Sequence, residues 1–375
     1  MMNQTLAIFA DAYRELNHKK LFWITLGLSG ALMAIFALFG VSDDYVTFLW
    51  YHWTNVFGLT PAGAYRVIFS LAAIGFWLTW GATFLALVST SGIFPDFLTA
   101  GSIDLYLCKP IGRLRLFLTK YFAGLLFVAL QVTAFSVVSF LVMGFRGGIW
   151  APSIFLAIPI VTVYFSYLFS IQVFVGVWTR STIASFLVTA LCFLLFFGVH
   201  WIESRLLMLE TTLHSQTTFL DGRLKSVEGR IAALDTRPAG STEPASTRLE
   251  TALRQREELR ARRESVDTFL ANIDFWHNIL WGVKTVFPKT SETVNLLDLY
   301  LVQDDEVPAV VPRRGRFQTP PDPEDPANVE DRTAEARAAA VAVRHRSLGW
   351  VLGTSLLFEG VVVALAAWIF CRRDY

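Results

Sequence analysis

The chain has 375 residues, of which 54% are hydrophobic and 17% charged, and its formal net charge at pH 7 is +1. This composition is typical of integral membrane proteins and excludes an ordinary soluble domain. The three cysteines, Cys108, Cys192 and Cys371, exclude a disulfide framework, because the long hydrophilic insert described below contains none of them.

Residues 1–20 form the first predicted element. Apolar side chains recur there at spacings of three and four, at Leu6, Phe9, Tyr13 and Leu16. This pattern predicts an interfacial amphipathic helix that lies flat on the bilayer, followed by a basic flank at residues 18–20. The apolar run after this flank has spanning length, so no cleavable signal peptide is expected.

Residues 21–203 hold five predicted membrane spans, each long enough to cross about 30 Å of hydrocarbon. These spans are residues 21–40, 66–90, 121–145, 154–177 and 182–201. Tyrosines and tryptophans between residues 45 and 53 have the character of an interfacial aromatic belt.

The segment between the second and third spans, residues 91–120, is the most informative part of the chain. Residues 101–121, GSIDLYLCKPIGRLRLFLTKY, place basic side chains among aliphatic ones, which suits neither lipid nor an ordinary polar loop. Pro110 cannot continue a helix and splits the stretch into two short pieces. We expect a docking element here. Topology determination and attraction to anionic lipid stay open as a simpler explanation of the basic residues.

A large hydrophilic insert, residues 204–347, follows the fifth span. Apolar residues repeat at heptad spacing in its first half, at Leu213, Leu220, Leu224, Val227, Ile231 and Leu234. This seam and a second, less regular stripe after it predict a helical hairpin over residues 204–272. Residues 275–288 are expected to form a short helix in the outer leaflet, and residues 303–331 a disordered linker. The last segment, 348–375, holds a sixth span at 348–370 and a tail.

The distribution of basic residues predicts the orientation. They concentrate on the side of the bilayer that carries both termini, which the positive-inside rule assigns to the cytoplasm. Residues 204–347 then lie on the extracytoplasmic side. The predicted fold class is an all-α polytopic membrane protein with six transmembrane helices, an N-terminal interfacial helix and a large extracytoplasmic hairpin insert.

The order of residues in 101–113, GSIDLYLCKPIGR, followed by Lys120-Tyr121 and a new span, resembles the cytoplasmic segment between spans 2 and 3 of type 2 ABC exporter permeases. The lateral first helix and the Arg-Arg-Asp-Tyr end at residues 372–375 match that family as well. The resemblance does not extend to residues 205–346.

This resemblance implies the transmembrane subunit of an ATP-driven exporter in a bacterial inner membrane. A coupling helix would dock on a cytoplasmic ABC ATPase subunit, present in two copies, and a second permease copy would complete a homodimer or heterodimer. The residues implied in ATPase docking are Gly101, Ser102, Asp104, Leu105, Lys109, Pro110 and Arg113. ATP and magnesium would be bound by the partner ATPase and not by this chain.

The chain itself is not expected to be an enzyme. It lacks the GxxxxGK[ST] phosphate loop, and no catalytic, cofactor or metal motif is recognised. Glu359 is the only acidic residue well inside a span, where a carboxylate costs about 2.5–3.5 kcal/mol on insertion scales. It is expected to face a cavity, a partner or the bundle interior. A role in the substrate path or in gating and a purely structural contact both stay open.

Two other functions are weighed against the exporter. A non-transporting membrane scaffold would present the outer coiled-coil hairpin to an envelope partner. An intramembrane enzyme is disfavoured by the missing polar catalytic cluster. Membrane lipids are expected contacts, and nucleic acid is not.

Overall fold

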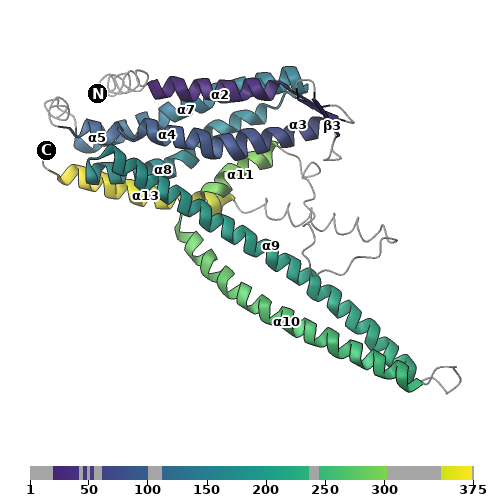
Figure 1. The fold of residues 1–375 in the computed structure, drawn as a ribbon. Coiled ribbons are helices and arrows are strands. Elements are labelled where there is room, and N and C mark those ends of the chain that lie inside the picture. The colour runs from purple at the N-terminus through teal and green to yellow at the C-terminus, as the bar shows by residue number, and fades with distance from the viewer. Residues whose placement is uncertain are drawn as a thin grey trace. The chain divides into compact units, whose positions relative to one another are not determined.

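The structure is a computed structural model that describes residues 20–41, 45–48, 51–54, 61–99, 112–235, 245–301 and 348–373. This described part is almost entirely helical and divides into two compact units (Figure 1). Unit 1 combines the described residues up to Phe197 with those from Phe287 onward, and unit 2 is Gly198–Val286. The elements are α2 (Lys20–Ala37), β1 (Phe39–Val41), β2 (Tyr45–Phe48), β3 (Tyr51–Thr54), α3 (Pro61–Phe69), η1 (Ser70–Ala82), α4 (Thr83–Thr90), α5 (Ile93–Phe97), α7 (Arg113–Gly147), η2 (Pro152–Leu156), α8 (Ala157–Thr179), α9 (Thr182–Asp235), α10 (Ala245–Val286), α11 (Thr290–Leu301) and α13 (Leu348–Arg372).

Length and composition indicate a multi-pass membrane protein. Five helical segments of the described chain are long and apolar enough to cross a bilayer, namely Tyr65–Phe97, Arg113–Gly147, Pro152–Thr179, Thr182–Leu206 and Gly349–Arg372. They correspond to predicted spans two to six. The first predicted span corresponds to α2, whose 18 residues extend over only about 27 Å. The predicted interfacial helix and the linker at 303–331 lie outside the described residues, apart from Lys20.

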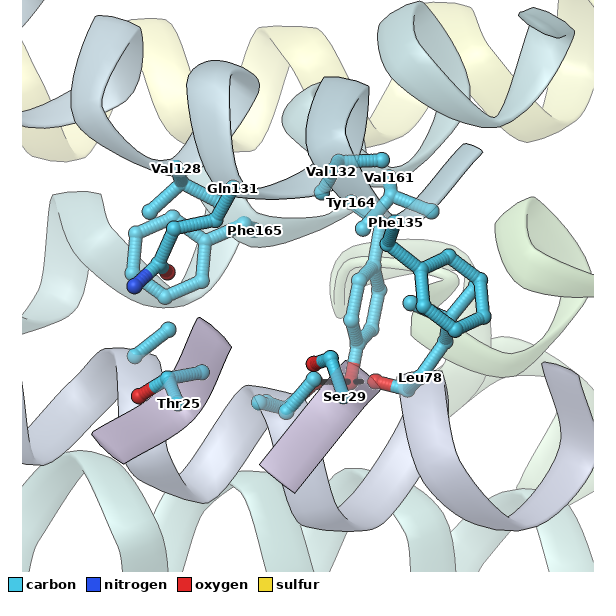
Figure 2. A pocket seen from close by; sticks show the side chains of 13 residues that line it. Thr25, Ser29, Leu78, Val128, Gln131, Val132, Phe135, Val161, Tyr164 and Phe165 are labelled. Carbon is cyan, nitrogen blue, oxygen red and sulfur yellow. Dashed lines mark hydrogen bonds between the residues drawn. The ribbon is translucent and has the colours of Figure 1, made fainter. Parts of the chain in front are cut away.

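The second span is not a uniform α-helix. Between α3 and α4 it contains η1, a π-helix of 13 residues, in which backbone hydrogen bonds join residues five apart. Two threonine side chains follow the same spacing: Thr79 donates to the carbonyl oxygen of Ile74 at 2.9 Å and Thr83 to that of Leu78 at 2.8 Å. Because π segments are uncommon and recur at functional sites, η1 and the small pocket it lines (Figure 2) are of functional interest.

Three short strands after α2 form an antiparallel sheet in the order β1-β2-β3. Thr47 of β2 pairs with Gly40 of β1 on one side and with His52 of β3 on the other. The all-α prediction is incomplete here, because the aromatic residues were interpreted only as a membrane-interface belt. Aromatic and β-branched residues favour strands as well as interfaces, so composition alone does not separate the two.

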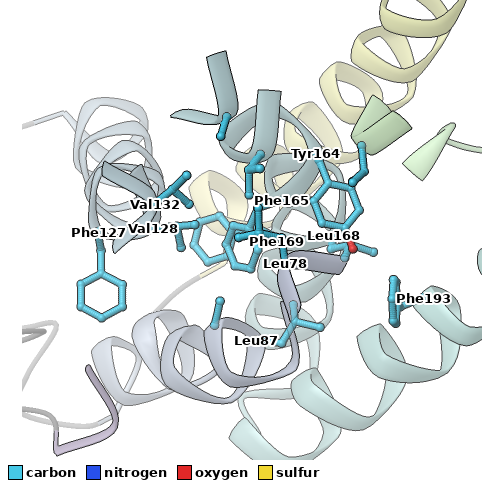
Figure 3. Close-up of a cluster of buried hydrophobic side chains, with 14 of the residues drawn as sticks. Leu78, Leu87, Phe127, Val128, Val132, Tyr164, Phe165, Leu168, Phe169 and Phe193 are labelled. Atoms are coloured by element: carbon cyan, nitrogen blue, oxygen red, sulfur yellow. The ribbon is translucent and has the colours of Figure 1, made fainter. Parts of the chain in front are cut away.

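Helix α8 is the centre of unit 1 and packs against α4, α5, α7, α11 and α13. Of the most apolar 18 residues within Pro152–Thr179, 61% are buried. The corresponding share for Gly349–Arg372 is 22%. Figure 3 shows Phe165 and Phe169 of α8 among side chains from the neighbouring helices, and both rings are almost fully buried. Gly124 allows α7 to approach this core, because a Cβ atom there would lie only 2.5 Å from the ring of Phe169. Close packing around α8 therefore fixes the arrangement of the spans.

Unit 2 consists of the second part of α9 and the whole of α10. Three salt bridges join them: Lys284 with Glu203, Arg263 with Asp221 and Arg260 with Glu228. From Glu203 to Asp221 to Glu228 the residue number on α9 increases, while that of the partner on α10 decreases from Lys284 to Arg263 to Arg260. The two helices are therefore antiparallel. Between them lies a small apolar cluster that includes Leu213, Leu270 and Ile273.

Two details of the predicted insert are corrected. The separate outer-leaflet helix at 275–288 is wrong, because α10 continues without a break to Val286. The change from charged to aromatic composition near residue 273 introduces no helix breaker, and Pro288 is the first residue that ends the helix. The second apolar stripe, predicted at Leu249, Leu253, Leu259, Val266 and Phe269, is also wrong at its last position, since Phe269 is 51% exposed whereas Leu270 is buried.

Candidate functional site

The structure places one of the seven predicted ATPase-docking residues. Arg113 is the first residue of α7. Gly101, Ser102, Asp104, Leu105, Lys109 and Pro110 lie outside the described residues. The candidate site therefore consists of Arg113 and the described residues at the two ends of the predicted coupling segment, 91–99 and 112–120.

Both described ends of the predicted segment 91–120 belong to the core of unit 1. At its start Phe94 and Phe97 of α5 are buried, and near its end Phe117 of α7 is fully buried. The ring of Phe117 lies 5.1 Å from that of Phe94 and 5.6 Å from that of Phe370 on α13. The ring of Phe97 is also stacked on that of Phe370, at 6.2 Å, so apolar packing holds each described end of segment 91–120 against α13.

Lys120 near the start of α7 is a buried cation. It is only 3% exposed, and its ammonium lies 5.3 Å from the centre of the Phe97 ring. A cation over an aromatic face is attracted by the electron density of the ring. Lys120 therefore also joins α7 to α5.

Arg113 connects the start of α7 to the end of α13. Its guanidinium donates hydrogen bonds to the carbonyl oxygens of Cys371 and Arg373, at 3.1 and 3.0 Å. The last carbonyl groups of a helix have no partner within the helix and carry its partial negative charge. Arg113 satisfies two such groups at the end of α13 and places a positive charge beside them.

Arg373 repeats this arrangement one helix further on. Its guanidinium donates to the carbonyl oxygens of Val177 and Trp178 at the end of α8, at 2.7 and 3.1 Å. We call Arg113 and Arg373 together the arginine relay. Through the relay, the last of the predicted docking residues is joined to α13 and then to α8.

Glu359 lies on α13 and faces the bundle interior. The hydroxyl of Tyr121 on α7 donates to one carboxyl oxygen, and that of Ser166 on α8 donates to the other, each at 2.7 Å. These two hydrogen bonds satisfy both carboxyl oxygens and so offset part of the cost of burial. Glu359 therefore links the same three helices that the arginine relay joins at their ends.

Sequence reasoning missed several buried polar links within unit 1. Gln172 of α8 donates to the carbonyl oxygen of Leu87 at 2.7 Å and accepts a bond from Thr90 at 2.8 Å. Lys289, only 1% exposed, bonds the hydroxyl of Thr354 and lies 4.2 Å from the ring centre of Trp350. A glutamine inside an apolar span was an available signal for the first link. No sequence pattern identified the second, because its partners are more than 60 residues away.

A small pocket of about 30 Å³ lies among α2, η1, α4, α7 and α8. Gln131 contributes an amide to it, and Thr25, Ser29, Thr83 and Tyr164 contribute hydroxyls. Sequence reasoning did not predict this pocket, since its polar residues come from separate spans.

Comparison with known proteins finds no matching family model, no matching characterised protein and no matching solved structure. The observations that bear on function are therefore the arginine relay, the half-buried carboxyl group of Glu359 and the sequence resemblance.

Proposed function

We propose that the chain is the membrane-spanning permease subunit of a type 2 ABC exporter, driven by a separate ATPase subunit. The observation that carries this proposal is the arginine relay, because it joins the end of the resembling segment to two transmembrane helices. A partner that displaces residues 101–113 would act on α13 and α8 through four hydrogen bonds. If the basic residues of segment 101–121 only determined topology, hydrogen bonds from Arg113 to the end of α13 would not be needed.

Mechanically, the permease converts a local displacement into a choice between two arrangements of its helices. ATP binding to the partner must favour one arrangement, and the difference in contact free energy between the two sets how far the equilibrium shifts. Glu359 supports this role, since its contacts with Tyr121 and Ser166 tie α13 to α7 and α8 along their length. The chain itself performs no covalent chemistry in this mechanism.

The topology of the proposal includes α2 as a sixth span. An apolar helix of 18 residues crosses the hydrocarbon where the bilayer thins locally or flanking residues reach the interface. Both termini are then cytoplasmic, unit 2 is extracytoplasmic, and a second permease copy completes the transport path. The host membrane is the inner membrane of a bacterium.

Co-expression with the ATPase encoded by a neighbouring reading frame tests the proposal. We expect the ATPase to co-purify with the parent chain, and Asp104→Arg or Lys109→Glu to abolish this association. Lys225→Glu is the matched charge-reversal control, because Lys225 is exposed on α9 within unit 2. If no ATPase associates, or if the docking variants behave like the control, the exporter proposal fails.

A second variant separates docking from transmission. Arg373→Gln leaves residues 101–113 unchanged and removes the charged group that bonds the end of α8. We expect the ATPase to bind this variant as it binds the parent, whereas stimulation of ATP hydrolysis by the permease is lost. An unchanged hydrolysis rate would show that the relay does not transmit the movement.

Unit 2 supports one other candidate, a scaffold for an envelope partner. Its helices form a compact unit of their own with three salt bridges, and translocation does not require such a pair. Deleting residues 204–285 with a short linker in their place distinguishes the two functions. A scaffold would lose its only partner, whereas an exporter would keep its association with the ATPase.

A further inference from the structure

The pocket among α2, η1, α4, α7 and α8 has a feature that the proposed function does not use. We propose that it binds an uncharged oxygen acceptor, either water or the carbonyl oxygen of a lipid, through the amide nitrogen of Gln131. This inference does not depend on an ATPase or on transport, so it can fail or succeed separately from the exporter proposal.

Helical spacing brings the polar groups to one place. Thr25 and Ser29 are four residues apart on α2 and so share a face. Gln131 lies on the face of α7 that also carries Val128 and Phe135, three residues before and four after it. In Figure 2 the amide of Gln131 and the hydroxyl of Thr25 lie toward one end of the pocket, and Ser29 toward the other.

The side-chain nitrogen of Gln131 is the group that calls for a ligand. Gln131 is 8% exposed, and this nitrogen has no hydrogen-bond acceptor within the described part of the chain. Burying an amide without a partner costs about 1–3 kcal/mol in proteins. An oxygen acceptor in the pocket would remove this cost.

Gln172 shows that the absence of a partner is not general for glutamines in these spans. It is more deeply buried than Gln131, at 2% exposure, and its amide both donates to Leu87 and accepts from Thr90. The two glutamines thus differ in whether the side-chain amide has hydrogen-bond partners in the protein. Gln172 links two helices, whereas Gln131 presents its donor to a cavity.

The lining selects the chemical class of the occupant. None of the 13 lining residues is charged, so an ion would be poorly stabilised. The Ser29 hydroxyl accepts from Trp77 at 3.1 Å and can donate its own proton to the occupant as a second bond. The Tyr164 hydroxyl already donates to the carbonyl oxygen of Thr79 at 3.3 Å, so it offers no donor to the occupant. A volume near 30 Å³ admits roughly two water molecules or one carbonyl group, since one water needs about 10–15 Å³.

Radiolytic labelling and native mass spectrometry of the purified full chain test this inference. X-rays convert bound water into hydroxyl radicals, which oxidise adjacent side chains. We expect Phe135 and Tyr164, which line the pocket, to be labelled more strongly than Phe169, which is also buried but lies outside the pocket lining. A lipid occupant would instead leave these residues unlabelled and appear as a retained lipid mass after delipidation.

Two variants test whether the pocket is the source of the side-chain labelling or of the retained lipid mass. Gln131→Leu removes the donor, and Ala86→Leu fills the pocket while keeping Gln131, so both should reduce labelling to the level of Phe169 or abolish the retained mass. Ser136→Ala is the control, because its hydroxyl is buried on α7 outside the pocket lining. The inference is overturned if the parent shows neither signal, or if the signal persists in Ala86→Leu, even should Gln131→Leu fail to fold.

Discussion

The contacts of Glu359 give the sharpest prediction about the stability of unit 1. Tyr121→Phe removes only the hydroxyl that donates to the carboxyl group, because the ring can keep its stacked contact with Phe169. Glu359→Gln keeps the size of the side chain and removes its charge. Together the two changes form a double-mutant cycle that isolates this hydrogen bond.

The expected coupling follows from the geometry of the bond. For an ionised Glu359 the hydroxyl bond contributes about 1.5–3 kcal/mol, whereas a neutral bond contributes about 0.5–1.5 kcal/mol. Tyr121→Phe should therefore lower the free energy of unfolding by the larger amount in the parent and by the smaller amount beside Glu359→Gln. The difference, a coupling of about 1 kcal/mol or more, corresponds to roughly a fivefold change in the unfolding constant.

Reversible unfolding in mixed micelles, titrated with sodium dodecyl sulfate and followed by tryptophan fluorescence, measures all four proteins. Tyr164→Phe paired with Glu359→Gln is the control, because the Tyr164 hydroxyl bonds the carbonyl oxygen of Thr79 instead. That pair should be additive within about 0.5 kcal/mol. If Tyr121 and Glu359 were equally additive, the hydrogen bond would contribute nothing specific and the reasoning would be refuted.

Two further predictions concern packing and ion pairing. Gly124→Ala should lower the free energy of unfolding by about 1–3 kcal/mol, because the added methyl group overlaps the buried ring of Phe169. Gly30→Ala is the control: the space around Gly30 is open, so this change should be neutral or mildly stabilising in the same titration. In unit 2, Lys284→Met should lower the free energy of unfolding by up to about 3–5 kcal/mol. The change removes the ammonium group that donates to the buried carboxylate of Glu203 and leaves that carboxylate without its ion-pair partner. Adding Glu203→Leu should recover most of that loss, and a double variant as unstable as the single one would contradict the argument.

Features that depend on neighbours in the sequence were predictable. The long spans follow from runs of apolar residues, and the burial of Leu213, Leu220 and Val227 follows from their heptad spacing. The extent of α10 could also have been predicted, because no proline occurs between Pro244 and Pro288. The sheet was not predictable, since its residues suit a membrane interface equally well.

Features that depend on contacts between distant segments were not predictable. The sequence indicated that Glu359 must avoid lipid, but its hydroxyl partners are 238 and 193 residues away. Arg113 was singled out for its charge, although its bonds to the end of α13 could not be inferred. Gln131 and Gln172 look alike in their spans, and only their neighbours distinguish a donor without a partner from a satisfied amide.

The sequence by itself determined that the chain is a membrane protein, where its long helices lie and where a cationic segment interrupts them, because hydrophobicity and helix breaking act over one or two turns. Only the tertiary structure decided which helix ends the arginines satisfy and which side chains surround each buried polar group. Those choices depend on how the spans pack around α8, and packing brings together residues that no local pattern connects.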